Sequence, residues 1–566
     1  MKTNKDETTI TITRKYAIIP TSSDMKEWNK KIYKFTVDKL NNKIVTLKEE
    51  IEKLNEKSKK KKLKDDEIKS LEELNKQLIE CNDTLEEITR TKEYTQKMIN
   101  DYTYSLVRTA MEEEARRKNY ILTWIYSCMV EHGVQYMETL KEKQKFIKDT
   151  INYAYRKKGS KDGSLFDNTE ITNILHGYGM AFKQTLTSKV CDLVKDGVLE
   201  GKVVLPNYKM DSPFTIEKAT MGFTHDYESY EELCEHINDK DLKLYFDYGG
   251  NQKPTIARFK INLGHGKNKD ELKATLLKLY SGEYQYCGSS IQISKNKIIL
   301  NLSMKIPKKE MDLDENVVVG VDLGMAVPAM CALNNSIYEK QPIGSADDFL
   351  AIRTRLQAQR RKLQIALKST AGGHGRKKKL KALNRLRDRE KHFVESYCHF
   401  VSKQVVDFAL KHRAKYINIE NLTGYDTSKF ILRNWSYYKL QQYITYKAAR
   451  YGIIVRKINP CYTSQVCSYC GHWEPKQRKS QDTFICGSED CISNNKKKVK
   501  YTVNADFNAA RNIAMSTLFM ETGEVTEKTK EKAREYYGFE EEYQKYKEKN
   551  EEAKENKEEE LYDLAA

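Results

Sequence analysis

Four cysteines near the C-terminal end of the sequence constrain its fold most strongly. Cys467 and Cys470 form a C-x2-C pair, and Cys486 and Cys491 form a C-x4-C pair after fifteen intervening residues. Two short knuckles of this kind bring four thiolates to one tetrahedral zinc ion, with each sulfur about 2.3 Å from the metal. A glycine beside or within each pair favours tight turns around a metal over four free buried thiols. Four cysteines leave no vacant coordination position, so we expect the zinc to be structural.

Three carboxylates lie far apart in the sequence but in related contexts. Asp322 ends the apolar run VVVGVD, and Glu420 ends the run KYINIE, so both are expected at the ends of strands. Asp506 opens DFNAARNI, where it would lie in the first turn of a helix and be favoured by the helix dipole. A single acid after a strand is more often a cap or turn residue. Three acids in such contexts favour a Mg²⁺-dependent phosphodiesterase site, in which two ions (Mg²⁺, or Mn²⁺ in its place) are held by hard oxygen ligands.

The charge of the chain indicates a phosphate-rich partner. Lys and Arg number 99 against 81 Asp and Glu, a net charge of +18. The excess is uneven, because residues 521–566 carry −7 and residues 1–520 carry +25. Such a basic chain is typical of nucleic-acid binding. Scattered cysteines and the absence of a signal-like or membrane-spanning run predict a cytoplasmic protein with no membrane partner.

The first half of the sequence predicts helices between strands of one sheet. Residues 8–19 alternate like a strand, whereas the apolar residues of 37–88 step by three and four around a charged turn. We expect residues 37–88 to form an antiparallel heptad hairpin, which serves either as a structural arm or as an RNA-contacting or dimerising arm. Short alternating runs after residue 201, with turns at 249–250 and 294–296, predict a small β-barrel that strand 8–19 joins.

A dense basic run follows the first candidate acid. Residues 340–391 contain 16 Lys and Arg against 4 Asp and Glu, around a Gly373-His374-Gly375 break. Such a run is either a solvated helix face or a phosphate-binding face, and its density favours the second. The sequence further predicts a helix over 434–450 and a strand over 453–458. The charged tail after residue 520 is expected to be a frayed helix or disordered.

The ordered motifs between residues 315 and 515 resemble those of a known superfamily. GVDLG, INIENLTG, RNWSYYKL, NPCYTSQVCSYCG, FICGSEDC and DFNAARNIA resemble the C-terminal half of TnpB and type V CRISPR effectors. The resemblance implies a RuvC-like nuclease of the RNase H fold (α/β) with an inserted zinc-ribbon module that binds target nucleic acid. The long helical block and the split barrel resemble the miniature type V-F effectors.

The resemblance also implies roles for particular residues. It makes Asp322, Glu420 and Asp506 the catalytic Mg²⁺ ligands and assigns the four cysteines to Zn²⁺. Arg433 and Trp435 match the segment after the second motif, where packing is the expected role. Two family arginines are missing, because Asp482-Thr483 and Ala505 occupy their positions. Basic residues are expected to contact nucleic acid: Arg360, Arg361, Arg376, Lys377, Lys378, Lys379, Arg433 and Arg478, with Arg478 and Lys479 as substitutes for the first missing arginine.

The resemblance implies a multidomain α+β protein. The expected parts are residues 1–20 (first strand of a wedge-like barrel), 21–200 (helical recognition domain), 201–314 (wedge-like β-barrel), 315–460 (RuvC-like motifs one and two), 461–500 (zinc ribbon), 501–520 (third motif) and 521–566 (charged tail). A guide RNA, double-stranded and single-stranded target DNA, a short motif adjacent to the target and a homodimer on one guide RNA are the implied partners.

Four functions fit these observations to different degrees. The leading one is a CRISPR-associated RNA-guided DNA endonuclease, and a transposon-associated TnpB-like nuclease would use the same chemistry. A guided binder that does not cut would be expected to lack one of the three acids, and all three are present. A zinc-ribbon DNA-binding regulator would leave the separated carboxylates unexplained.

Overall fold

The computed structural model describes most of the chain. It covers residues 8–21, 26–60, 65–91, 95–156, 169–239, 242–249, 257–264, 266, 269–324, 327–370, 372–421, 437–480, 482–491, 503–520 and 525–565. The chain divides into two compact units, Met1–Pro307 and Lys308–Ala566. None of the helices in these ranges combines the length and apolar character needed to cross a membrane.

The first unit contains an antiparallel sheet with helices between its first two strands. The hydrogen-bonded path runs β2-β7-β8-β1-β5-β4-β3, with β6 paired to β8. The strands are β1 (Thr9–Thr21), β2 (Phe214–Ile216), β3 (Met221–His225), β4 (Leu244–Tyr248), β5 (Ala257–Asn262), β6 (Gln285–Tyr286), β7 (Ser289–Ser294) and β8 (Lys297–Pro307). β1 pairs with β5 and β8, which confirms that the first strand joins strands beyond the helical block. The described path is open at β2 and β3, so its hydrogen bonds do not close a barrel.

Local sequence explains how this sheet is formed. Alternation along β1 buries Tyr16 and Ile18 in the core shared with β8. At the predicted 294–296 turn, Lys295 and Asn296 both adopt positive φ, as a tight hairpin between β7 and β8 requires.

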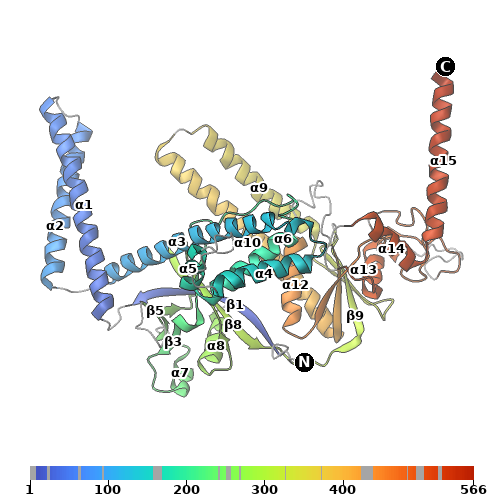
Figure 1. Cartoon of the computed structure of the whole chain (residues 1–566), viewed down its shortest axis with the longest axis horizontal. Helices are drawn as coiled ribbons and strands as arrows, with labels where there is room; N and C mark the ends of the chain where they lie inside the picture. The colour runs from blue at the N-terminus through green and yellow to red at the C-terminus, as the bar shows by residue number, and fades with distance from the viewer. Residues whose placement is uncertain are drawn as a thin grey trace. The chain divides into compact units, whose positions relative to one another are not determined.

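The helices of the first unit include a long hairpin. They are α1 (Lys26–Lys60), α2 (Asp65–Thr91), α3 (Gln96–Glu131), α4 (Leu140–Arg156), α5 (Thr169–Tyr178), α6 (Met180–Lys195), α7 (Tyr230–His236) and α8 (Lys269–Tyr280). α1 and α2 lie side by side (Figure 1), and Ile44, Leu47 and Cys81 are buried between them. The heptad interpretation of residues 37–88 is therefore confirmed as a hairpin.

The second unit is organised around a five-stranded mixed sheet. Its order is β11-β10-β9-β12-β13, with β12 parallel to both β9 and β13 and the other pairs antiparallel. The strands are β9 (Asp314–Asp322), β10 (Ala329–Leu333), β11 (Lys340–Ile343), β12 (Ala414–Glu420) and β13 (Ile454–Ile458), with a separate pair of β14 (Thr483–Phe484) and β15 (Val503–Asn504). The helices are α9 (Ala346–Lys368), α10 (Gly373–Lys411), α12 (Tyr437–Ala449), α13 (Ala505–Met515), α14 (Glu527–Tyr537) and α15 (Glu540–Ala565).

The two faces of this sheet carry different helices. Val319, Val321, Ile417 and Ile419 point into one core with residues of α10 and α12. The alternate residues of β9 and β12 face the other side, against which α13 packs. Because side chains alternate along a strand, Asp322 and Glu420 lie on the α13 side.

The acidic tail is helical, so of the two predicted alternatives, a frayed helix or disorder, the structure favours the helix. Residues 525–565 contain α14 and α15, and Phe539 is buried between them on Trp473, with ring centroids 4.6 Å apart. Arg534 is also buried, where it contacts Glu527, Glu540 and the hydroxyl of Tyr462. The low aliphatic content left disorder as an alternative, but these aromatic contacts order the beginning of the tail.

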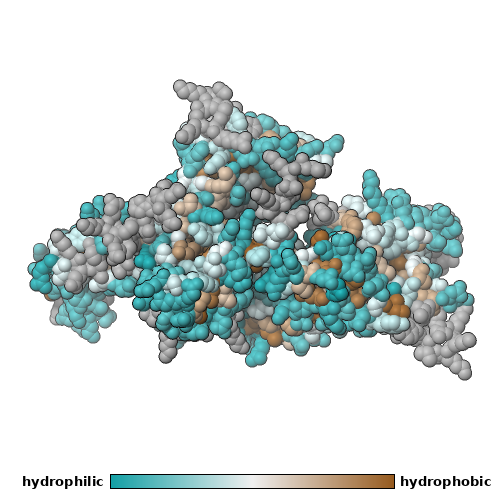
Figure 2. All heavy atoms as spheres, turned by 90° about the horizontal axis from the view of Figure 1, so that it is seen from below, coloured by the Kyte–Doolittle hydropathy of each residue, from teal (hydrophilic) through white to brown (hydrophobic). Residues whose placement is uncertain are grey.

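The surface is largely polar. Hydrophilic side chains cover most of the face drawn in Figure 2, with apolar residues in scattered groups between them. This pattern agrees with a chain in which 32% of the residues are charged.

Candidate active site and metal centre

The two strand acids lie at neighbouring positions of the sheet. Asn418 of β12 lies opposite Gly320 of the parallel strand β9. Glu420 and Asp322 each follow two residues later, so both carboxylates project from the same face at the same level. Neighbouring strands are about 4.8 Å apart, which brings the two side chains close together.

The third acid comes from α13. Asn504 caps this helix, because its side-chain oxygen accepts a hydrogen bond from the Phe507 backbone N–H at 2.9 Å. Asp506 therefore lies in the first turn, as predicted, and only 3% of it is exposed. An ideal Cβ on Gly324, just beyond β9, would lie 3.8 Å from the Asp506 carboxylate. The structure thus brings the three predicted acids together from three separate elements.

The electrostatics of the cluster indicate a place for cations. Burial and the nearby charges of Glu420 and Asp506 raise the pKa of Asp322 well above its usual range. Burial raises the pKa of Glu420 to about 7, and it raises the pKa of Asp506 as well. Neighbouring carboxylates oppose one another's ionisation because their negative charges repel. A divalent cation bound between them would offset that repulsion, so these acids are suitable metal ligands.

Two further side chains belong to this cluster. The Thr463 hydroxyl donates a hydrogen bond to Glu420 Oε1 at 2.7 Å. Arg478 Nη2 lies 3.3 Å from Asp506 Oδ1, and its charge opposes the rise in the pKa of all three acids. Thr463 was missed by the sequence analysis, since a lone threonine in NPCYTSQ carries no signal for this contact. Arg478 was expected only as a nucleic-acid contact or a substitute for the family arginine.

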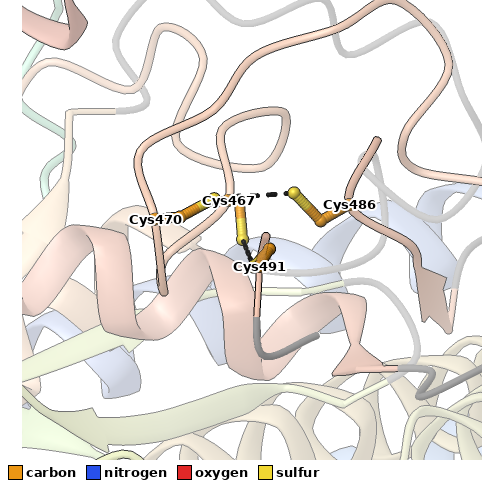
Figure 3. A group of neighbouring side chains, drawn as sticks. All are labelled: Cys467, Cys470, Cys486 and Cys491. Atoms are coloured by element: carbon orange, nitrogen blue, oxygen red, sulfur yellow. Dashed lines mark hydrogen bonds between the residues drawn. The ribbon is translucent and has the colours of Figure 1, made fainter. Parts of the chain in front are cut away.

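The four cysteines form the second cluster (Figure 3). Their sulfur atoms all lie within 4.8 Å of one another. Cys467 and Cys491 Sγ are 3.6 Å apart, and so are Cys470 and Cys486 Sγ. A tetrahedral zinc ion with sulfur ligands at about 2.3 Å requires sulfur–sulfur distances of about 3.8 Å, so the geometry fits zinc. Burial raises the pKa of Cys470 to about 11, and a bound cation would be needed to ionise it at neutral pH.

The predicted basic residues divide into different environments. Arg376 Nη1 donates to the Leu367 and Thr370 carbonyls, and Lys379 Nζ donates to the Ala366 carbonyl, so these two close the end of α9. Arg360 contacts Glu390 at 2.7 Å. Arg361, Lys377 and Lys378 are exposed on the α9–α10 hairpin. Arg433 and Trp435 lie outside the described residues.

Comparison with known proteins identifies several relatives of the chain. Residues 437–513 match the family described as Cas12f1-like, TNB domain. The chain is 33% identical over 334 residues to the CRISPR-associated endodeoxyribonuclease Cas12f1 of Sulfoacidibacillus thermotolerans, covering 57% of this chain and 72% of that protein. It is 38% identical over 259 residues to the protein of the same name from Syntrophomonas palmitatica, covering 40% of this chain and 51% of that protein.

A solved structure supports the fold. The structure titled as a Cas12f1–sgRNA–target DNA complex is similar with a TM-score of 0.53 at 20% identity, over 90% of this chain and 100% of that one. At this identity the similarity concerns the fold alone. The relative from Sulfoacidibacillus shares sequence over most of its own length, and by that similarity the chain belongs to the Cas12f1 family, a miniature type V-F branch of the TnpB-related nucleases.

Proposed function

We propose that the chain is a CRISPR-associated RNA-guided DNA endonuclease that cuts with Asp322, Glu420 and Asp506. The observation that carries the proposal is the convergence of these acids from β9, β12 and α13, with their pKa values raised together. Membership of a family whose curated relatives are named endodeoxyribonucleases supports it.

The residues of the chain would divide the catalytic work. The three carboxylates would hold divalent cations, which when bound would stabilise the attacking and leaving oxygens of the phosphodiester. Thr463 fixes the orientation of Glu420 through its hydrogen bond. Arg478 offsets part of the negative charge of the cluster and presents a guanidinium beside the place where the phosphate would enter. Arg478 would thereby compensate for the missing arginine at residues 482–483.

The fold supports assigning each part of the chain to a type of domain. The β11-β10-β9-β12-β13 order with α13 against it fits a RuvC-like nuclease of the RNase H fold, and the four-cysteine module fits a zinc ribbon with structural Zn²⁺. The helices and the sheet of the first unit fit a recognition region inserted in a wedge-like domain. The domain boundaries given above stay proposals, as do the guide RNA, target DNA, a homodimer on one guide and a cytoplasmic location.

One experiment tests the function directly. The full chain is purified with RNA expressed from its own locus, the co-purifying RNA is sequenced, and a plasmid library randomised beside the target is exposed to the complex with Mg²⁺. Guided cutting next to a short motif, lost in Asp322→Ala, is expected. Guided binding without cutting by the unaltered protein would contradict the nuclease. A repeat-spacer array beside the gene, as opposed to transposon ends, separates the CRISPR role from the TnpB-like alternative.

The α9–α10 hairpin is the proposed phosphate-binding face. Changing Arg361, Lys377 and Lys378 together to Gln should lower the salt-dependence slope of guide binding by about 2 to 3 units, at roughly 0.7–0.9 per phosphate contact. The matched control changes Arg376 and Lys379 to Gln, because these residues close the end of α9. This control variant should lower the melting temperature and leave the slope of guide binding nearly unchanged. An unchanged slope in the triple variant would mean a merely solvated helix face.

A further inference from the structure

The segment 463–468 connects the two clusters through backbone and side-chain contacts. At one end, Thr463 donates its hydroxyl to Glu420. At the other end, Cys467 lies between Val466 and Ser468 and belongs to the sulfur cluster. Only three residues lie between the carboxylate contact Thr463 and the zinc ligand Cys467.

The helix that carries Asp506 is bound to this same segment by buried polar side chains. Asn512 Nδ2 donates to the Thr463 carbonyl at 2.8 Å and to the Val466 carbonyl at 2.7 Å. Asn508 donates to the Val466 carbonyl and accepts from the Ser468 N–H, both at 2.8 Å. Arg511 Nη1 adds a bond to the Ser468 carbonyl. A buried amide left without its partners is costly, so each of these contacts resists a shift of α13 relative to the segment.

Other contacts of α13 do not involve the segment. Asn418 of β12 donates to the Ile513 and Ser516 carbonyls at the end of the helix. On β9, a Cβ added to Gly320 would lie 2.0 Å from the Ala510 carbonyl oxygen, so helix and strand are in direct backbone contact. These contacts hold α13 against the sheet. Asn508 and Asn512 instead join α13 to the backbone on either side of the zinc ligand Cys467.

We propose that Asn508 and Asn512 are positioning residues that couple the zinc centre to the carboxylate cluster through segment 463–468. When zinc holds Cys467, the segment is fixed at that end. The segment then orients Glu420 through Thr463, and it positions Asp506 through the bonds to Asn508 and Asn512. Loss of zinc then weakens divalent-cation binding at the acids. This coupling rests on the proposed nuclease site, and thermodynamic linkage makes it reciprocal.

Manganese binding to the guide-free full chain tests the coupling without any cleavage assay. Free Mn²⁺ is followed by electron paramagnetic resonance, before and after dialysis against phenanthroline to remove zinc. Zinc removal should weaken Mn²⁺ binding by about tenfold in the unaltered chain. Asn508→Ala/Asn512→Ala with zinc retained should already show the weaker binding, and zinc removal should then change it by less than about twofold.

Further variants separate coupling from simple loss of stability. Asn512→Asp keeps the side-chain size and removes both donated bonds, and it should reproduce the weaker Mn²⁺ binding with zinc still bound. Asn418→Ala lowers the stability of α13 from the other side and should keep the full response to zinc removal. In the reciprocal measurement, saturating Mn²⁺ should slow zinc transfer to a chromogenic chelator in the unaltered chain and not in the double variant.

The outcomes distinguish the coupling from the proposed function. Mn²⁺ binding that does not respond to zinc removal, or a double variant that responds like the unaltered chain, would overturn the coupling and leave the nuclease site standing. Mn²⁺ binding no tighter than that of Asp322→Ala would overturn the carboxylate site and the coupling with it.

Discussion

The sulfur cluster and the carboxylate cluster are both candidate metal sites of the second unit, but they are built in opposite ways. The four cysteines lie within 25 residues of sequence, in loops around short strands. The three acids span 185 residues and come from two strands and a helix. The cysteines can therefore meet through local turns, whereas the acids meet only when the sheet and α13 have assembled.

This difference predicts different roles for metal binding in the two clusters. Four thiols gathered by local turns form a structural zinc site, and zinc bound there contributes folding free energy. The acids are held by a sheet with its own apolar core, and their mutual repulsion opposes that assembly. Zinc should therefore be needed for structure, and the cations at the acids for chemistry.

The largest effect is expected at the acids. Asp322→Ala, Glu420→Ala or Asp506→Ala should each lower the guided cleavage rate by roughly a thousandfold or more, as expected for loss of a catalytic group. Guided DNA binding should persist, because the basic surface is unchanged. Asp407→Ala, an exposed acid of α10, is the matched control and should cut normally. Full Mg²⁺-dependent cutting by any one of the three variants would remove that residue from the site.

The next effect is expected at the cysteines. Cys467→Ser or Cys486→Ser should release zinc and lower cleavage by about 10- to 100-fold, since the acids stay intact but their supporting loop does not. Cys287→Ser, a partly exposed cysteine of the first unit, should retain zinc and activity. Metal analysis of protein purified without oxygen provides the measurement. Absence of zinc from the unaltered protein would contradict the closed site.

The two clusters also differ in how far the sequence predicted them. The cysteine spacing identified the whole sulfur cluster, because its geometry is a local property of the knuckles. The acids were identified by strand and helix context together with family resemblance, but their supporting residues were not. Thr463, Asn508 and Asn512 act through pairings between elements brought together by folding, and a short polar residue in a sequence does not reveal its partner. The sequence left the tail between a frayed helix and disorder for the same reason, because Phe539 gains its partner Trp473 only in the folded unit.

A smaller effect is expected where α13 meets the sheet. Gly320→Ala would place a methyl group against the α13 backbone, so the helix must move or the strand must bend. Overpacking of this kind costs about 1–3 kcal/mol, and the displaced Asp506 should lower cleavage by about tenfold. Gly375→Ala in α10 is the matched control, since its added Cβ would meet nothing within 4 Å. If Gly320→Ala melts and cuts normally, the close contact between α13 and β9 does not determine the position of Asp506.

The smallest effect is expected from pH on the guide-free protein with zinc bound and no other divalent cation. The folded-state pKa values of Asp322, Glu420 and Asp506 are raised, so the folded chain binds more protons than the unfolded chain between the ordinary carboxyl pKa and about 7, the value for Glu420. Stability from these groups is therefore present at low pH and is lost as the pH rises through that window. The melting temperature should fall from about pH 5 to about pH 7, and Asp322→Asn should reduce the fall. Added Mg²⁺ should oppose it, because the cation replaces the protons as the partner of the carboxylates. A melting temperature that responds to neither pH nor Mg²⁺ would mean that folding does not raise the pKa values of these acids, and the contrast with the zinc cluster would then lose its electrostatic basis.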